Sequence, residues 1–373
     1  MPRSCFVMSL ESSKAFLSLV RLGLGHDSNT VGAIEVQPNQ TDWRGIQDLA
    51  KSQGLYAIVL DGVERLPENK RPPKGLLLEW IGEVLHRYEY MYGEYRCAIA
   101  GMAGLYNAHG IKMMILKGYG LGMNYPNPKH RPCGDIDIWT YGKQKESDAI
   151  LSKEKGIKID NSHRHHTVFE WYGFTVENHY DMMTVDANRT NMILEPIMKE
   201  LAMDDSNCIE IEGERVYLPS ANFNALFLLR HMLMHFVSTD MNLRQLTDWA
   251  FFWEKHGIEV DVDWLYALLE KHHMKAFFNI VNSICVEDLG FQSSVFPDTP
   301  QCDSNTKDRV VREVLYPEFD WRRAHDKNVI ERVSFKYKRW KGGAWKRDLC
   351  CSEGPLESFL WSARSHLLKP SSI

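Results

Sequence analysis

A pair of aspartates, Asp135 and Asp137, interrupts the short apolar segment RPCGDIDIW at residues 131–139. Side chains of a β-strand alternate between its two faces, so both carboxylates would point the same way while Ile136 and Ile138 enter a core. Two neighbouring carboxylates repel each other and resist burial unless a divalent cation neutralises them. The pattern alone is therefore compatible with a metal site or with a solvated strand edge.

A glycine turn precedes this strand. Residues 111–116 (IKMMIL) are a short apolar run, which predicts a buried strand. The run leads through the turn KGYG (117–120) into a short predicted helix over residues 121–125. A turn that enters a helix N-terminus exposes backbone N–H groups and the positive end of the helix dipole, which suit a phosphate. One element could thus hold phosphates and the next the metal that bridges them.

This order of elements resembles the minimal core of the polymerase-β-like nucleotidyltransferase superfamily. Within it, the motifs Leu-Lys-Gly, Tyr-Pro-x-Pro and Arg-Pro-x-Gly-Asp-Ile-Asp are similar to those of the uncharacterised nucleotidyltransferases found in many bacteria, over about residues 111–182. The resemblance implies a small mixed sheet with the aspartate pair on one strand and a third carboxylate on a later strand. The turn departs from the commoner Gly-Gly or Gly-Ser form, because Lys117-Gly118 stands there.

The third carboxylate is expected in residues 174–180 (FTVENHY), which alternate like a strand. This strand would place Glu177 and His179 on one face. The resembling family has a strand reading roughly Val-Glu-x-His at this place, so Glu177 is the third acid that the resemblance implies. Glu170, before the turn, and Asp181, at the end of the strand, are the alternatives.

Three such carboxylates support a two-metal mechanism. Two Mg²⁺ ions about 3.5–4 Å apart would clamp the attacking and leaving oxygens of an in-line displacement. Asp135 and Asp137 would bridge the ions, and Glu177 would complete the ion that binds the acceptor hydroxyl. The residues expected to bind the NTP are Lys117, Gly118, Arg131 and Gly134. The alternatives are an ordinary surface lysine at position 117 and a solvated loop arginine at position 131.

Three histidines, His163, His165 and His166, lie just before the strand of Glu177. Imidazole is a common zinc ligand, but no cysteine or acid lies at zinc-like spacing around this cluster. The histidines would otherwise line the cleft, and one of them could contact a nucleotide phosphate.

A second polar cluster follows on two predicted helices. His231 and His235 are four residues apart in an apolar helical pattern over residues 223–236, and Arg244 and Asp248 are four apart soon after it. The resembling family carries a similar histidine-rich helix followed by a Leu-Arg-x-Leu-x-Asp helix. The cluster would be structural, with an Arg–Asp pair tying the helices, or it would form a wall that contacts the nucleotide or the acceptor.

The 373 residues are enough for two or three domains. We expect an α+β fold with a helical N-terminal region (1–109), a mixed-sheet nucleotidyltransferase core (110–219) and a helical C-terminal domain (220–373). Amphipathic patterns around Trp43 and over residues 74–109 predict helices in the first region, and residues 208–218 predict a hairpin at the end of the core.

Composition limits the function classes. The net charge of −5 gives no global support for nucleic-acid binding, although basic and aromatic residues alternate over residues 335–347. Eight scattered cysteines without a Cys-x-x-Cys motif are typical of reduced thiols. No apolar run approaches the roughly 20 residues of a membrane helix. We expect a cytoplasmic protein without a cleaved signal peptide.

The leading hypothesis is a Mg²⁺-dependent enzyme that binds an NTP such as ATP and moves a nucleoside monophosphate to a hydroxyl acceptor. The acceptor could be a small molecule, a protein or an RNA. A glycosyltransferase is an alternative because its D-x-D pair also binds a metal and a nucleotide, but that fold needs a longer nucleotide-binding half before the motif. A non-catalytic or regulatory protein on the same scaffold is a third hypothesis.

Overall fold

The computed structural model describes residues 10–26, 36–185, 187–238, 241–297, 302–319, 329–350, 354, 357 and 361. Parts of the predicted N-terminal and C-terminal helical regions therefore lie outside the described residues.

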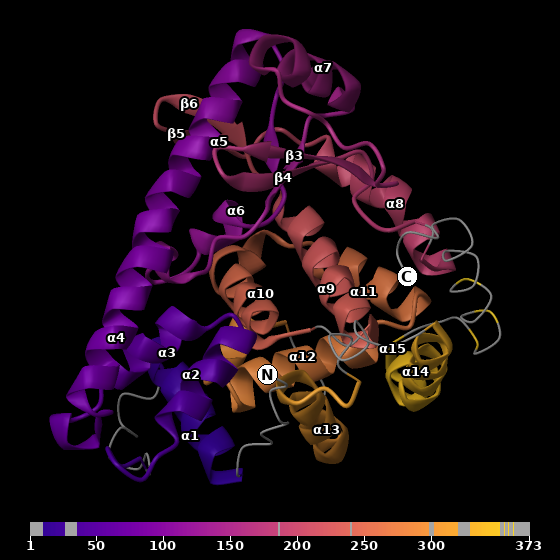
Figure 1. The fold of residues 1–373 in the computed structure, drawn as a ribbon. Helices are drawn as coiled ribbons and strands as arrows, with labels where there is room; N and C mark the ends of the chain where they lie inside the picture. Colours follow the sequence, from indigo (N-terminus) through magenta and orange to yellow (C-terminus); the bar gives the residue numbers. More distant parts are fainter. Residues whose placement is uncertain are drawn as a thin grey trace.

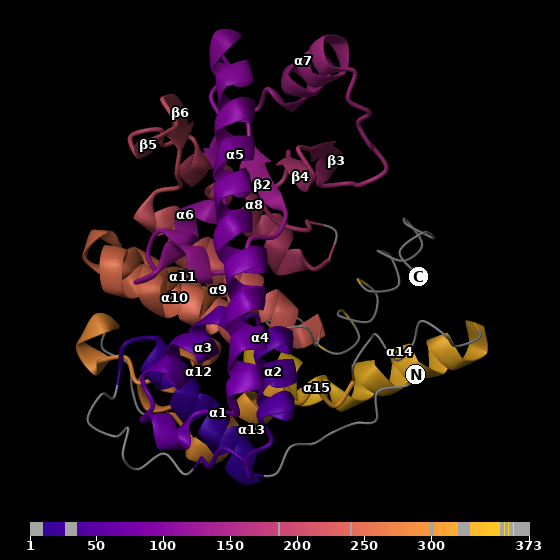
Figure 2. The same cartoon turned by 60° about the vertical axis from the view of Figure 1, so that its left-hand side comes forward.

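A long helical rod runs from the N-terminal helices to the sheet (Figures 1 and 2). It consists of α4 (Lys74–Val84), a π-helical stretch η3 (Leu85–Tyr90) and α5 (Met91–Ala108). Before it come α1 (Leu10–Gly23), α2 (Trp43–Ser52), α3 (Tyr56–Glu64) and the short turn η2 (Glu68–Lys70). The helices predicted around Trp43 and over residues 74–109 are present.

The strands of the described residues form one sheet in the order β3-β4-β2-β1-β6-β5. They are β1 (Met114–Ile115), β2 (Ile136–Trp139), β3 (His166–Trp171), β4 (Phe174–His179), β5 (Cys208–Ile211) and β6 (Glu214–Tyr217). The sheet is mixed, because β2–β4 and β1–β6 are parallel and the other pairs antiparallel. In the β5–β6 hairpin, Glu212 and Gly213 both have positive φ, as a tight two-residue hairpin turn requires.

Short elements connect the strands. They are α6 (Tyr119–Gly122) and η4 (Pro128–His130) between β1 and β2, α7 (Gln144–Lys155) after β2, and α8 (Arg189–Ala202) after β4. The C-terminal elements are α9 (Ala221–Ser238), α10 (Leu243–His256), η5 (Gly257–Glu259), α11 (Val262–Lys271), α12 (Lys275–Glu287), η6 (Ser293–Val295), α13 (Ser304–Leu315), α14 (Val329–Gly342) and α15 (Ala344–Cys350).

The two faces of the sheet belong to different cores. On one face, Ile136, Ile138 and Val176 pack with Ile99 of α5 and Leu151 of α7. Side chains on the other face of the sheet, such as Met114 and Trp139, belong to a larger core that contains residues of the N-terminal and C-terminal helices. Asp137 therefore faces away from α5, toward the C-terminal helices.

The helices at the two ends of the chain share that larger core. Hydrogen bonds also join them: Ser13 on α1 to Tyr316 at 2.8 Å, and Gln53 after α2 to the carbonyl of Val314 on α13 at 3.1 Å. In Figure 1, α1, α2 and α3 accordingly lie beside α12 and α13.

The predicted α+β class, a small mixed sheet flanked by helical regions, is confirmed. The division of the chain into three regions, with boundaries at 109/110 and 219/220, stays a prediction. Within the described residues, no helix is long and apolar enough to cross a membrane.

Candidate functional site

The parallel pairing of β2 with β4 places Asp137 directly opposite Glu177. Asp135 comes two residues before Asp137, just outside the strand. One carboxylate oxygen from each of the three acids lies within 4.8 Å of the others. The acids that the sequence analysis singled out are thus brought together, and the register of two strands fixes their spacing.

Two cationic side chains contact Asp137, which is only 4% exposed. Lys117 Nζ lies 3.0 Å from Asp137 Oδ1, and His179 Nε2 donates to the same oxygen at 3.0 Å. Burial would raise the pKa of Asp137, but the charge of Lys117 and the hydrogen bond from His179 outweigh it and hold that pKa well below its usual range. Asp137 is therefore a buried, charged carboxylate.

Asp135 has the opposite shift. The residue as a whole is exposed, but desolvation of its carboxyl and repulsion by Asp137 raise its pKa, and the charge of Lys117 offsets them only partly. A second negative charge next to Asp137 is thus costly without a further cation. The two aspartates repel each other as the sequence pattern implied.

Two histidines contact Glu177. His179 Nε2 lies 3.4 Å from Glu177 Oε2, and His166 Nδ1 on β3 lies 3.7 Å from the same oxygen. Burial lowers the pKa of His166 to about 4. Burial would also lower the pKa of His179, but its hydrogen bonds to Asp137 and Glu177 raise it to about 9. The role of His179 was not inferred from the sequence, although the Glu-x-His spacing on a strand was the signal for it.

The alternative third acids have other partners. Glu170 is exposed and accepts a hydrogen bond from Thr175 at 2.9 Å. Asp181 pairs with Lys199 at 2.6 Å and with His165 at 3.4 Å. His163 stacks on His166, with ring centroids 4.9 Å apart. Of the three clustered histidines, only His166 therefore lies in the group with Glu177 and His179.

The glycine turn carries Lys117 to the acids. Gly118 has φ +57° and ψ −107°, a conformation that favours glycine. The amides of Gly120 and Gly122 donate to the carbonyls of Lys117 and Gly118 at 3.2 and 3.0 Å. Any phosphate contact of this turn must therefore use other amides. Lys117 is not an ordinary surface lysine, because its side chain is largely buried against Asp137.

Arg131 is buried rather than solvated, which corrects the alternative reading of a loop arginine. Its Nε and Nη2 atoms donate to the two oxygens of Asp248 at 2.8 and 2.9 Å, and Tyr125 donates to Asp248 at 2.7 Å. Asp248 thus pairs with Arg131 and not with Arg244. The pair ties the loop before β2 to helix α10, and spacing along α10 alone could not reveal a partner so far away in sequence.

A small cavity of about 70 Å³ lies beside the aspartates. All four residues predicted to bind the nucleotide line it, namely Lys117, Gly118, Arg131 and Gly134, together with Asp135, Asp137, His231, Arg244 and Asp248. The Nε atom of Arg244 is buried there without a hydrogen-bond partner among the described residues.

A larger cavity of about 410 Å³ lies on the other side of Lys117. Its wall includes His166, Glu177 and His179 of the sheet, and His231 and His235 of α9, whose Nε2 atoms are 3.2 Å apart. Lys117 and His231 line both cavities. The acids therefore lie between two spaces of different size.

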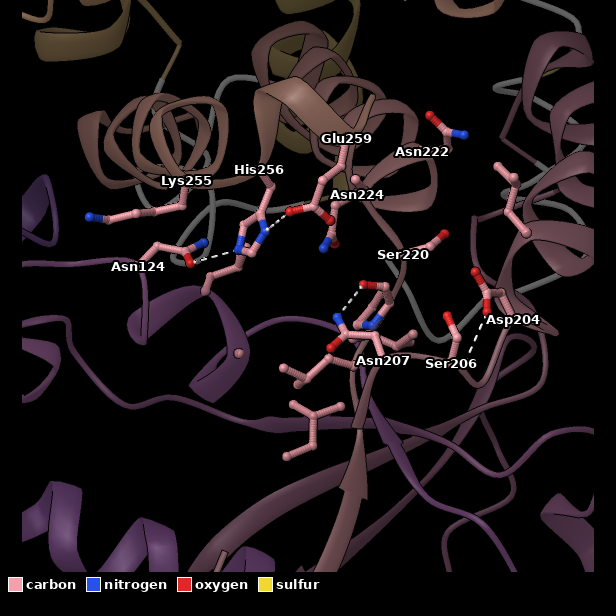
Figure 3. A pocket seen from close by; sticks show the side chains of 18 of the residues that line it. Asn124, Asp204, Ser206, Asn207, Ser220, Asn222, Asn224, Lys255, His256 and Glu259 are labelled. Carbon is pink, nitrogen blue, oxygen red and sulfur yellow. Dashed lines mark hydrogen bonds and ion pairs between the residues drawn. The ribbon is translucent and has the colours of Figure 1, made fainter. Parts of the chain in front are cut away.

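A third cavity, of about 940 Å³, contains none of the three acids in its wall. Figure 3 shows His256 in it, between Asn124 and Glu259, with a hydrogen bond of 3.1 Å to each. Leu121 of α6 separates this space from the small cavity, since it lines both.

Comparison with known families gives a match over residues 39–290 to the model of an uncharacterised nucleotidyltransferase family. The chain belongs to this family. The match contains the resembling segment 111–182 and extends it over the N-terminal rod and helices α9 to α12. Neither the curated proteins nor the solved structures contain a significant match. As a member of a nucleotidyltransferase family, the protein is a transferase, and nucleotidyl transfer is favoured over both the glycosyltransferase and the non-catalytic hypotheses.

Proposed function

We propose that this nucleotidyltransferase moves a nucleoside monophosphate from an NTP to a hydroxyl acceptor, with Mg²⁺ held by Asp135, Asp137 and Glu177. The observation that carries the proposal is the clustering of these three carboxylates within 4.8 Å across the β2–β4 register. Oxygen ligands of this kind are what Mg²⁺ prefers.

The electrostatics of the site fit a cation. Lys117 and His179 both contact the same oxygen of Asp137. The pKa of Asp135 is raised because desolvation and the charge of Asp137 disfavour its ionised form. Bound Mg²⁺ would neutralise the carboxylates, polarise the transferred phosphoryl group and lower the pKa of the acceptor hydroxyl. The carboxylates hold that cation at the junction of the two cavities.

The small cavity is the proposed phosphate side. Lys117 and Arg244 bring positive charge to it, while Arg131 is neutralised by Asp248. A phosphate bound beside Asp137 would lie within reach of Lys117. The Lys117 ammonium group would then pair with the phosphate instead of with Asp137. Arg131 would then position the loop that carries Gly134 and would not bind the phosphate by itself.

The larger cavity is the proposed acceptor side, since Glu177 lines it and Asp135 does not. Glu177 would orient the acceptor hydroxyl and accept its proton. A space of about 410 Å³ accommodates a small molecule or a single protein side chain. Residues 335–347, where basic and aromatic residues alternate, would be the surface for an RNA acceptor. Lys346 of this segment is buried and pairs with Glu313 at 2.7 Å, which favours a smaller acceptor.

The test measures binding of each of the four NTPs with and without Mg²⁺, together with the release of pyrophosphate. The double variant Asp135→Asn/Asp137→Asn should lose Mg²⁺-dependent binding. Glu170→Gln is the matched control, because it removes an exposed carboxylate from the neighbouring strand β3. Equal Mg²⁺-dependent affinity in the double variant and the parent would overturn the proposal.

A further inference from the structure

His166, Glu177 and His179 form a second group of potential ligands next to the aspartates. One donor atom from each lies within 4.8 Å of the other two. The antiparallel register of β3 and β4 pairs His166 with His179, and their ring centroids are 5.2 Å apart. Glu177 lies two residues before His179 and therefore on the same face of β4. Backbone pairing thus holds all three side chains on one surface.

We propose that these three side chains bind a transition-metal ion of the Zn²⁺, Co²⁺ or Mn²⁺ class, at a site that shares Glu177 with the three-carboxylate group. Two imidazoles and one carboxylate suit such ions, whereas Mg²⁺ is normally held by oxygen ligands alone. The proposal rests on the proposed function only through this shared residue. The ligand set itself is independent of Asp135.

The outer contacts of the histidines match those of metal ligands. His179 Nδ1 donates to the backbone carbonyl of Asp181 at 3.2 Å, which leaves Nε2 directed at Glu177 and Asp137. A metal ion at Nε2 would displace the proton that this atom donates to Asp137 and release it to solvent. A second ring nitrogen that donates to a carbonyl is the usual way in which a protein orients a metal-binding histidine. The ring of His166 is held by stacking on His163.

The site is accessible and has an open side. All three residues line the cavity of about 410 Å³, so an ion could enter and keep water or an acceptor group as further ligands. Three protein ligands with an open position are typical of catalytic metal sites, whereas structural zinc sites are closed by four. The ion would orient Glu177 toward the acceptor side and would add positive charge beside Asp137.

The first experiment uses the unmodified protein. After removal of metals with a chelator, the protein is titrated with Co²⁺ and its visible absorption spectrum is recorded, and metal content is measured after dialysis against Zn²⁺. We expect a ligand-field spectrum and one Zn²⁺ per chain that a large excess of Mg²⁺ does not displace. Displacement of Co²⁺ by Mg²⁺ at similar concentration would mean that only oxygen ligands bind the ion, and it would overturn the proposal.

The second experiment compares variants whose folding is verified by thermal unfolding. His166→Gln should weaken Zn²⁺ binding by more than about 10-fold, since even outer-sphere changes can cost that much. His109→Gln is the matched control, because this exposed histidine pairs with Glu154 outside the ligand group and the variant should bind Zn²⁺ like the parent. Unchanged Zn²⁺ affinity in His166→Gln would refute the site. If that variant unfolds, His166→Asp, which retains a ligand, should restore Zn²⁺ binding, and no binding by a folded His166→Asp would count against the site.

The variant Asp135→Asn separates this inference from the proposed function. It should lose Mg²⁺-dependent NTP binding and keep the Co²⁺ spectrum. If the parent protein gives the Co²⁺ spectrum but binds no NTP with Mg²⁺, that result contradicts the proposed function alone. Loss of the Co²⁺ spectrum in Asp135→Asn would show that Co²⁺ binding requires Asp135. That result would contradict the proposal that His166, Glu177 and His179 bind the ion without Asp135.

Discussion

The hydroxyl of Tyr95 donates a hydrogen bond to the backbone carbonyl of Asp135, at 3.0 Å. Tyr95 lies on α5 and is 1% exposed, so the N-terminal rod directly fixes the residue that begins the aspartate pair. The same hydroxyl lies against Gly118, where an added Cβ would be 2.5 Å from it. One phenol thus contacts both the glycine turn after β1 and the residue that precedes β2.

Replacing Tyr95 with Phe removes this bond and keeps the ring in the core. We predict a loss of about 1 kcal/mol in the free energy of unfolding, the usual net value of one hydrogen bond. Weaker Mg²⁺-dependent NTP binding should accompany it, because the carbonyl of Asp135 loses its anchor. Urea unfolding and NTP titration measure the two effects, and unchanged NTP affinity would argue against a positioning role for the hydroxyl.

Gly118→Ala should cost about 1–3 kcal/mol, because a side chain at this φ is strained and collides with Tyr95. The cost should be smaller in the Tyr95→Phe background, which removes the colliding oxygen, so a double-mutant cycle should show coupling. Gly93→Ala is the control, since it lies on α5 with nothing within 4 Å of the added Cβ. Equal costs of Gly118→Ala in both backgrounds would exclude the collision as the cause.

The buried pair of Arg131 and Asp248 should be sensitive to loss of one partner. Asp248→Leu leaves an uncompensated buried guanidinium, which typically costs about 3–5 kcal/mol. The double variant Arg131→Met/Asp248→Leu should recover much of this loss. Glu79→Gln removes the partner of Arg44 in an exposed pair and should cost less than about 1 kcal/mol. Denaturant unfolding of the parent and of these three variants measures the effects, and a small effect of Asp248→Leu would contradict the role of the pair.

Stability should depend on pH through His130, which contacts Asp61 at 2.7 Å and Glu89 at 3.3 Å. Burial would lower the pKa of His130, but the hydrogen bonds with these acids raise it above the ordinary value of about 6.5. A raised folded-state pKa stabilises the protein fully below the unfolded pKa, and the contribution is lost as pH rises through the folded value.

His130→Gln should therefore reduce the free energy of unfolding more at about pH 5.5 than at about pH 9. Unfolding curves of parent and variant at both pH values test this. A difference that does not change with pH would mean that His130 acts through packing alone.

Arg244→Gln should weaken NTP binding by about 10-fold, equivalent to about 1.4 kcal/mol, because it removes a positive charge from the phosphate cavity. Its effect on unfolding should stay below about 1 kcal/mol, since no ion pair of Arg244 exists among the described residues. Arg87→Gln, which changes an exposed arginine outside the wall of this cavity, is the control for NTP affinity. Normal NTP binding by Arg244→Gln would remove Arg244 from the phosphate side.

Local patterns sufficed for much of the fold. Alternation predicted the strands of Asp137 and Glu177, and helical spacing predicted the rod and α9. The parallel register that sets Asp137 against Glu177 joins strands 40 residues apart, so it depends on tertiary structure and follows from family resemblance rather than from spacing.

The partners of charged groups were harder to predict. The i,i+4 spacing of Arg244 and Asp248 suggested a pair, but the carboxylate of Asp248 instead meets Arg131, more than a hundred residues earlier in the chain. His166 reaches Glu177 only because the β3–β4 hairpin folds back in register. Spacing in sequence indicates which residues are neighbours along one element. The partner of a buried charged group is instead determined by desolvation and by the geometry of the folded chain.

The common core of the first and last helices has a consequence for synthesis on the ribosome. Residues of α1 and α3 share one core with residues of α12 and α13, which emerge more than 200 residues later. Until then the nascent N-terminal helices must expose their residues of this core, and contacts of such long sequence separation form slowly. A growing chain should therefore depend on chaperones until α13 has left the ribosome.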